Sequence, residues 1–172
     1  HHLARIGVSD FAVATIEEGI TLRKHKIPGN ILILGYTPAA CAHMLIRYDL
    51  TQTVVDPEHA RALADTRLPI KVHIKIDTGM HRLGVSCDDF HEVVQLLTNA
   101  PFHVTGMFTH LCCADSKVAS DVQYTRQQIA RFYALISQLQ ACQYPIPPIH
   151  IQSSYGVVNY PGLPCDYARI GI

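Results

Sequence analysis

The segment VHIKIDTGMHRLGV, residues 72–85, joins an apolar stretch to a group of charged side chains. Its first half alternates with period two, as in a β-strand, and places Lys75 and Asp77 on one face near the strand end. A glycine-containing turn then leads to Arg82. The group is either a set of ion pairs that only fixes a loop, or part of a site. Buried charges are costly unless they are paired, so a network is expected in both cases.

Strand-like and helix-like segments alternate along the whole chain. Apolar stretches predict strands at residues 11–15, 30–35, 52–55, 70–76, 102–110, 149–152 and 167–172. Helical spacing and capping residues predict helices at residues 16–25, 38–47, 57–65, 88–97 and 120–140. The strands are apolar on both faces, which indicates a parallel sheet covered by helices.

A doubly wound sheet and a closed barrel both fit this alternation. The number of predicted strands, seven, is one short of a (β/α)8 TIM-type barrel. Polar residues also gather where strands end, as they do at the active-site rim of such barrels: Thr15, Asp77, His110, Ser154 and Arg169. No G-x-G-x-x-G pattern follows a predicted strand, which argues against a dinucleotide-binding fold. We therefore expect an α/β barrel that is one strand short of eight.

Composition limits the function classes. The 172 residues suffice for one domain with a core, and 14 Lys and Arg balance 14 Asp and Glu. This balance gives no electrostatic reason to expect binding to nucleic acid or to an anionic membrane. The six scattered cysteines suggest neither a zinc site nor a disulfide framework and favour a cytoplasmic setting. No metal site is expected at residues 110–115, because neighbouring residues at a strand end point in different directions.

The stretch KIDTGMHRLG, residues 75–84, resembles the signature of the bacterial alanine racemases, which are fold-type III pyridoxal-phosphate (PLP) enzymes. The separation of 15 residues between Ser154 and Arg169 also matches that family. The resemblance extends to four further segments of the family. They are its second strand and helix (residues 11–23), the end of its sixth strand (106–110), its histidine-to-serine segment (150–154) and its last barrel strand (166–172).

The resemblance implies a cofactor site on the barrel rim. The PLP phosphate would be held by the Ser154 hydroxyl and by the backbone N–H groups of Gly171 and Ile172. Arg169 would face the pyridine nitrogen, and His110 would support the pocket beside it. Considered alone, an arginine such as Arg169 or a histidine such as His110 at a strand end more often has a structural role. A serine near a strand end, such as Ser154, is common and by itself indicates little. The functional interpretation is favoured because the whole set occurs in the family's order and spacing.

The resemblance also assigns the charged group around residue 75. Arg82 would reach the phenolic oxygen of the cofactor and the region of the substrate carboxylate. Lys75 would be carbamylated, which turns a cation into a carboxylate-like anion that positions Arg82. Asp77 would order the same turn.

The expected reaction is racemization of a small amino acid, alanine or serine, to supply D-amino acids for peptidoglycan. The family's first barrel strand, which carries its Schiff-base lysine, would lie before residue 1, so the barrel would lack its first strand. The family's opposing tyrosine would lie in a C-terminal β domain, across a homodimer. We therefore expect residues 1–172 to be a partial PLP-binding barrel that is inactive alone. Ser153 stands where the family usually has asparagine, and Cys112 and Cys113 replace an aromatic and a small residue, which affects fine cofactor contacts.

Two stretches, residues 30–36 and 163–169, resemble the racemase domain of the vancomycin-resistance serine racemases, which are membrane proteins with a cytoplasmic racemase domain. Any membrane contact would then come from segments outside this sequence. Two alternatives remain open. One is a related PLP barrel, a decarboxylase or D-amino-acid lyase, which the long signature around Lys75 disfavours. The other is a non-catalytic PLP-binding or PLP-homeostasis barrel.

Overall fold

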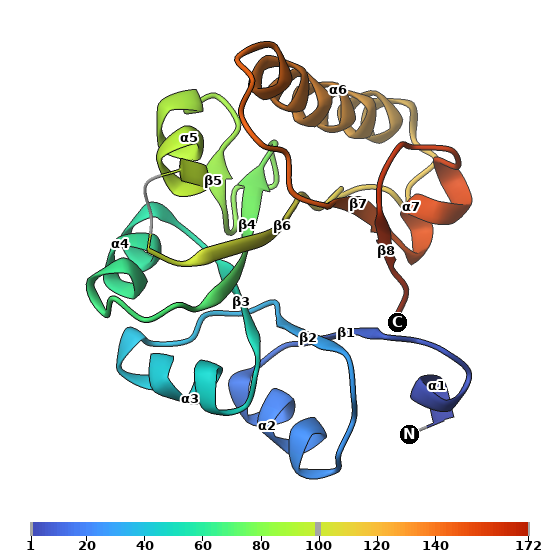
Figure 1. Cartoon of the computed structure of the whole chain (residues 1–172). Helices are drawn as coiled ribbons and strands as arrows, with labels where there is room; N and C mark the ends of the chain where they lie inside the picture. The colour runs from blue at the N-terminus through green and yellow to red at the C-terminus, as the bar shows by residue number, and fades with distance from the viewer. Residues whose placement is uncertain (1, 99–100, 172) are drawn as a thin grey trace.

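The strands form one parallel sheet that is curved into an almost closed barrel (Figure 1). This arrangement is seen in a computed structural model that describes residues 2–98 and 101–171. Along the sheet lie β1 (Asp10–Val13), β2 (Asn30–Ile33), β3 (Thr51–Val54), β4 (Lys71–Asp77), β6 (His103–Phe108), β7 (Ile149–Ser153) and β8 (Tyr167–Arg169). Every neighbouring pair is parallel, and the two-residue β5 (Val85–Ser86) pairs with the end of β4. The predicted barrel is confirmed.

Helices surround the barrel (Figure 1). They are α1 (His2–Arg5), α2 (Ile16–Lys24), the 3-10 turn η1 (Ala39–Cys41), α3 (Ala42–Arg47), α4 (Pro57–Asp65), α5 (Phe90–Thr98), α6 (Ala119–Ala141) and α7 (Ser154–Asn159). Two predicted helix starts are confirmed by their caps, since Thr15 accepts the N–H of Glu18 at 3.4 Å and Asp56 that of His59 at 2.7 Å. Within the described residues, no helix combines the length and apolarity needed to cross a bilayer.

The barrel is open along one seam. β1 pairs with β2 and β8 pairs with β7, but no ladder joins β8 to β1 among the described residues. Figure 1 shows the segment that follows β8 beside β1 at this seam. The seam is where the fold departs from a closed (β/α)8 barrel, in agreement with the expectation that one strand is lacking.

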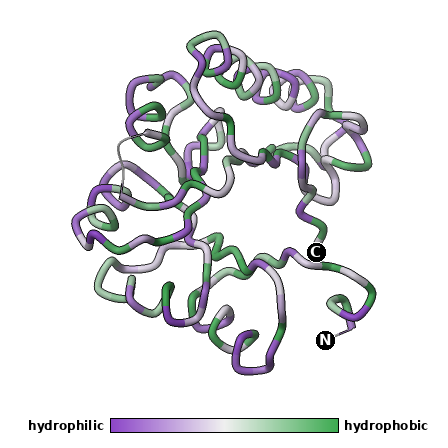
Figure 2. Tube along the Cα trace, viewed as in Figure 1, coloured by the Kyte–Doolittle hydropathy of each residue, from purple (hydrophilic) through white to green (hydrophobic). Residues whose placement is uncertain are grey.

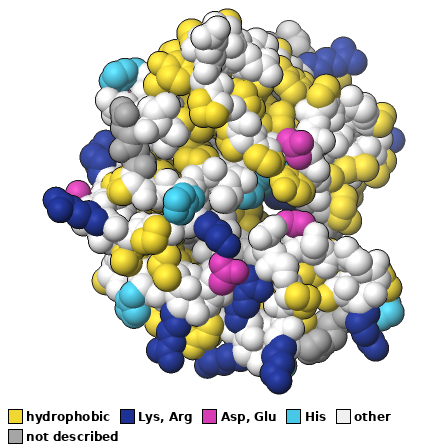
Figure 3. Space-filling model, viewed as in Figure 1, with side chains coloured by type: hydrophobic (Ala, Val, Ile, Leu, Met, Phe, Trp, Pro, Cys, Tyr) yellow, Lys and Arg dark blue, Asp and Glu magenta, His cyan; other side chains and the backbone are white. Residues whose placement is uncertain are grey.

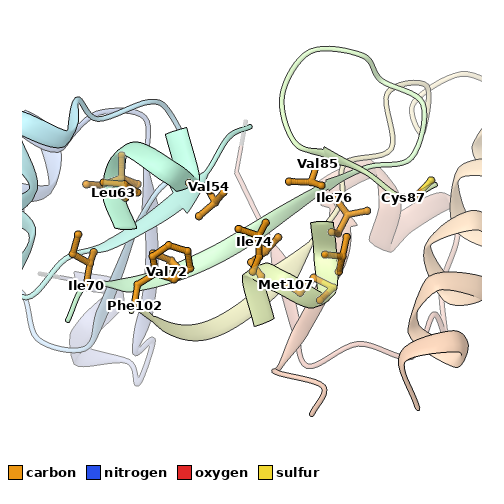
Figure 4. Close-up of a cluster of buried hydrophobic side chains, with 14 of the residues drawn as sticks. Val54, Leu63, Ile70, Val72, Ile74, Ile76, Val85, Cys87, Phe102 and Met107 are labelled. Carbon is orange, nitrogen blue, oxygen red and sulfur yellow. The ribbon is translucent and has the colours of Figure 1, made fainter. Parts of the chain in front are cut away.

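The alternation of β4 separates the core from the barrel interior. Val72, Ile74 and Ile76 are fully buried and belong to the same apolar cluster as Leu63 of α4. The three side chains of β4 follow one another along the strand in Figure 4. Figure 2 shows hydrophobic stretches along the strands. Successive strand residues point to opposite faces, so Lys75 is turned toward the inside of the barrel. The local pattern of residues 72–85 therefore positions a charged side chain at the site.

Candidate active site

A cavity of about 750 Å³ lies at the carboxyl ends of the strands. This volume is in the range of pockets that hold cofactors and small ligands. The loops and ends of β4, β6, β7 and β8 contribute to its wall. Of the five strand-end polar residues that predicted a rim, His110, Ser154 and Arg169 line this cavity, whereas Thr15 and Asp77 do not. The structure brings together six of the predicted site residues as lining residues: Lys75, Arg82, His110, Ser154, Arg169 and Gly171. The seventh, Ile172, lies outside the described residues.

Arg169, at the end of β8, is held by several acceptors at once. One terminal nitrogen lies 2.7 Å from Nδ1 of His150, and the other donates to the carbonyl of Thr109 at 2.9 Å. The guanidinium also lies over the Phe108 ring, 5.0 Å from its centroid. Burial lowers the pKa of Arg169 to about 10, which leaves it a cation at neutral pH. Its contacts to described residues use the two terminal nitrogens, so Nε remains available as a donor.

Two histidines inside the barrel form a directed chain with this arginine. Arginine can only donate, so Nδ1 of His150 accepts from Arg169, and the proton of the neutral ring is on Nε2. That Nε2 then donates to Nδ1 of His73 at 2.9 Å. A Cβ at Gly106 would lie 2.5 Å from the His73 ring, so glycine makes room for it. His73 lies two residues before Lys75 on β4, so the period-two alternation places both side chains on the interior face.

Burial and positive charge keep the site histidines neutral. Burial, then Arg169 and His73, lower the pKa of His150 to about 2. Burial lowers the pKa of His73 to about 4, with a smaller contribution from Arg169. His110 also has a pKa of about 4, because of burial and the charges of Arg169, Arg82 and Lys75. Its Nδ1 lies 3.4 Å from a terminal nitrogen of Arg169, so a neutral imidazole lies beside the fixed cation.

Lys75 is an ammonium in an unfavourable place. Only 3% of it is exposed, and its Nζ donates to the carbonyl of Leu83 at 2.6 Å. Burial lowers its pKa to about 8, with Arg82 and Arg169 lowering it further and Asp77 opposing them. A sizeable fraction of Lys75 is therefore an uncharged, nucleophilic amine near pH 8.

The turn after β4 is ordered by a carboxylate. Asp77 accepts the N–H of Gly79 at 2.9 Å and that of His81 at 3.0 Å. Arg82 follows this turn with its side chain exposed, and it makes no hydrogen bond among those of the described residues. Lys75 donates to the carbonyl of Leu83 and makes no hydrogen bond with Arg82, because two cations repel each other.

Ser154 and Gly171 face each other across β7 and β8. The Ser154 hydroxyl donates to the Gly171 carbonyl at 2.7 Å and accepts the Gly171 N–H at 3.0 Å. Both residues line the cavity wall, where Ser154 is half-buried and Gly171 is exposed. Ser154 opens the short helix α7, with Ser153 as its N-cap. A hydroxyl and a backbone N–H thus lie close enough to bind the same anion.

The site histidines, of which His150 is buried and His73 and His110 are half-buried, predict acid destabilisation. Above pH 6.5 His73, His110 and His150 are neutral in both the folded and the unfolded chain. As the pH falls from 6.5 toward 4, the unfolded chain binds protons that the folded chain excludes. The free energy of unfolding then falls by up to ~1.4 kcal/mol per pH unit for His73 and for His150, and by less for His110, which solvent screens more. Urea unfolding at pH 7, 6 and 5 measures this slope.

The control for this slope is a matched pair of variants. His73→Gln removes one half-buried imidazole and reduces the slope, whereas His103→Gln changes an exposed residue of β6 and leaves it as it is. Equal unfolding free energies at pH 7 and pH 5 in the unmodified chain would contradict the burial of these histidines.

Comparison with known proteins adds independent findings. The family model described as "Alanine racemase, N-terminal domain" matches residues 1–172. An "Amino-acid racemase" of Enterococcus faecalis is 41% identical over 172 residues, which are 100% of this chain and 24% of that protein. A "Serine/alanine racemase" of Enterococcus gallinarum is 41% identical over 170 residues, which are 99% of this chain and 24% of that protein. The solved alanine racemase of Clostridium difficile 630 superimposes with a TM-score of 0.90 at 31% identity. The match covers 99% of this chain and 48% of that protein. The chain thus spans between 24% and 48% of the length of these relatives.

Proposed function

Because the chain belongs to the alanine racemase N-terminal domain family, we propose that the protein containing it racemizes a small amino acid, alanine or serine, with PLP bound in the rim cavity. Enzymes of this family depend on PLP. The observation that carries the proposal is that six residues scattered over the sequence line one cavity of sufficient size. PLP, when bound, supplies an electron-withdrawing ring that acidifies the Cα–H bond of an attached amino acid.

The phosphate end of the cofactor fits the pair formed by Ser154 and Gly171. These two groups now satisfy each other at 3.0 Å, and a phosphate would accept from both in place of that hydrogen bond. Backbone N–H groups bind anions without a cationic side chain. We assign Ser154, Gly171 and Ile172 to the phosphate, the last on the family resemblance alone.

Arg169 fits the pyridine nitrogen of the cofactor. It lines the cavity, it is a permanent cation, and its Nε has no partner among the described residues. A donor that cannot accept a proton keeps the pyridine nitrogen unprotonated and limits delocalisation of charge into the ring. The removal and return of the Cα proton then depends on two opposed bases, a lysine and a tyrosine outside this sequence. His110 supports the arginine from the side.

Lys75 fits a carbamate better than an ammonium. The neutral amine, favoured by its pKa of about 8, adds to CO2 and releases a proton, which leaves an anion at the end of the side chain. An anion there would attract Arg82, which lines the same cavity, and hold it toward the substrate carboxylate. The carbamate also replaces a repulsion between two cations by an attraction.

The partner and the setting belong to the same proposal. We propose a homodimer that completes the site, and a cytoplasmic location in which the product supplies peptidoglycan synthesis. Apolar side chains lie exposed beside the cavity, with 59% of Tyr155 and 71% of Ile170 accessible. Figure 3 shows further hydrophobic side chains on the α6 and α7 side of one face. Such a surface is suited to contact with another domain or subunit.

The test is an assay of the protein encoded by the complete reading frame around this segment. It should bind PLP and convert both L-alanine and D-alanine, or both L-serine and D-serine, to the racemic mixture. Chiral chromatography measures both directions. Decarboxylation or elimination of the amino acid would favour the related PLP barrels, and PLP binding without any turnover would favour the homeostasis barrel.

A further inference from the structure

The long helix α6 holds the turn that follows β4. Three of its side chains, spaced by about one helical turn each, contact that turn. The Tyr124 hydroxyl donates to the carbonyl of Gly79 at 2.6 Å, and Arg131 donates to the carbonyl of Thr78 at 3.0 Å. Between them, Nε2 of Gln128 donates to the Thr78 hydroxyl at 3.4 Å. The turn that leads to Arg82 is therefore fixed from outside the cavity.

Gln128 also binds the loop that carries His110. Its Nε2 donates to the His110 carbonyl at 3.2 Å, and its Oε1 accepts the Cys112 N–H at 3.1 Å and the Cys112 thiol at 3.3 Å. Only 1% of Gln128 is exposed. Its two N–H donors and both acceptor positions are thus engaged, which is the full capacity of an amide. One buried side chain connects two loops of the rim that are about thirty residues apart in sequence.

The network continues to the cation of the site. Because Gln128 donates to the Thr78 hydroxyl, that hydroxyl is free to donate to the hydroxyl of Thr109, 2.8 Å away. The carbonyl of Thr109 in turn accepts from Arg169 at 2.9 Å. A path of polar contacts therefore runs from α6 to Arg169 through the buried residues Gln128, Thr78 and Thr109, and its last link is the main-chain carbonyl of Thr109.

We propose that Gln128 is a positioning residue of the racemase, which sets the β4 turn and the His110 loop in register with Arg169. The inference rests on the proposed function, because Gln128 does not line the cavity and acts through residues that do. An apolar side chain of the same size would leave the Thr78 hydroxyl, the His110 carbonyl and the Cys112 N–H without this partner. Both loops would then adjust independently, and displacement of a reacting group by about 1 Å can cost about 100-fold in rate.

The test compares two adjacent glutamines in the complete racemase. Gln128→Met should lower kcat by about 10-fold to 100-fold. Gln127→Met changes the exposed neighbour on the same helix and should leave kcat unchanged. Visible circular dichroism of the bound PLP reports its surroundings without turnover, and this signal should change for Gln128→Met alone. Thr78→Val should act through the same path, so the double variant Gln128→Met, Thr78→Val should lose less than the product of the two single losses.

The outcomes separate the two proposals. If the unmodified protein racemizes and Gln128→Met matches Gln127→Met in kcat and in dichroism, the positioning role is overturned while the function stands. Additive losses for Gln128 and Thr78 also overturn it. If Gln128→Met does not fold, Gln128→Glu keeps the shape and the acceptor and removes both donors. Activity equal to that of Gln127→Glu then overturns the proposal. If the unmodified protein has no racemase activity, the proposed function fails, and a dichroism change confined to Gln128 variants still supports the coupling of the loops.

Discussion

Replacing Lys75 by alanine in the complete protein should lower the kcat of the proposed racemase by about 100-fold or more, since the proposed carbamate that orients Arg82 would be lost. Lys75 is almost fully buried beside Arg82 and Arg169. Removing it leaves Arg82 exposed and without an anionic partner among the described residues. Steady-state assays in both directions measure the effect. Lys24→Ala, at an exposed position of α2, is the matched control and should not change kcat.

The carbamate makes this prediction more specific than the loss of any buried lysine. Enzyme prepared in buffer free of CO2 should be less active and should recover on addition of bicarbonate, whereas Lys75→Ala should not respond. A small carboxylic acid that enters the cavity should partly restore Lys75→Ala. A high-resolution density map that shows a plain ammonium at Lys75, with Arg82 held by other groups, would refute the carbamate.

The sequence predicted the fold well where local chemistry determines it. The start of α4 at Pro57 follows from the Asp-Pro pair, and the cap at Asp56 is present at 2.7 Å. The alternation of residues 72–77 predicted which side chains of β4 enter the barrel. Strand ends were predicted less exactly, because a strand ends where its ladder ends. The last strand, expected to run to residue 172, stops at Arg169, and Gly171 pairs with a side chain instead.

Contacts between distant segments could not be predicted from spacing. His59, in the predicted helix at residues 57–65, is only 2% accessible, and its ring lies 2.9 Å from the carbonyl of Thr37. The pair of His73 and His150 joins residues 77 positions apart, and Gln128 binds two loops that the pairing of β4 with β6 brings together. The short helix α7 was missed because six residues give too little periodicity to detect.

Six of the site residues nevertheless came from the sequence, since a resemblance carries information about tertiary structure that local patterns lack. The family order placed Lys75, Arg82, His110, Ser154, Arg169 and Gly171 at one rim, and they line one cavity. The residues that hold them in place were not identified in that way. They make no contact with the expected cofactor, so a list of ligand-binding residues does not include them.

Arg169→Glu should have the second large effect and should change the chemistry as well as the rate. Arginine cannot take up a proton from the pyridine nitrogen, whereas a glutamate stabilises the protonated form of that nitrogen. Charge would then delocalise further into the ring. We expect racemization to slow by about 100-fold, a new long-wavelength absorption band, and keto acid formed by transamination. Stopped-flow absorbance and chiral chromatography measure these effects together.

The control for Arg169 has to separate charge from hydrogen bonding. Arg169→Lys keeps a cation but has one nitrogen for the acceptors on His150 and Thr109, so it should lower the rate without the new band. Cofactor content and thermal unfolding show whether each variant is folded and loaded. If Arg169→Glu leaves both the rate and the spectrum unchanged, Arg169 does not face the cofactor. Ser154 and Gly171 would then lose their assignment too, because the cofactor orientation that places the phosphate between them also places the pyridine nitrogen at Arg169.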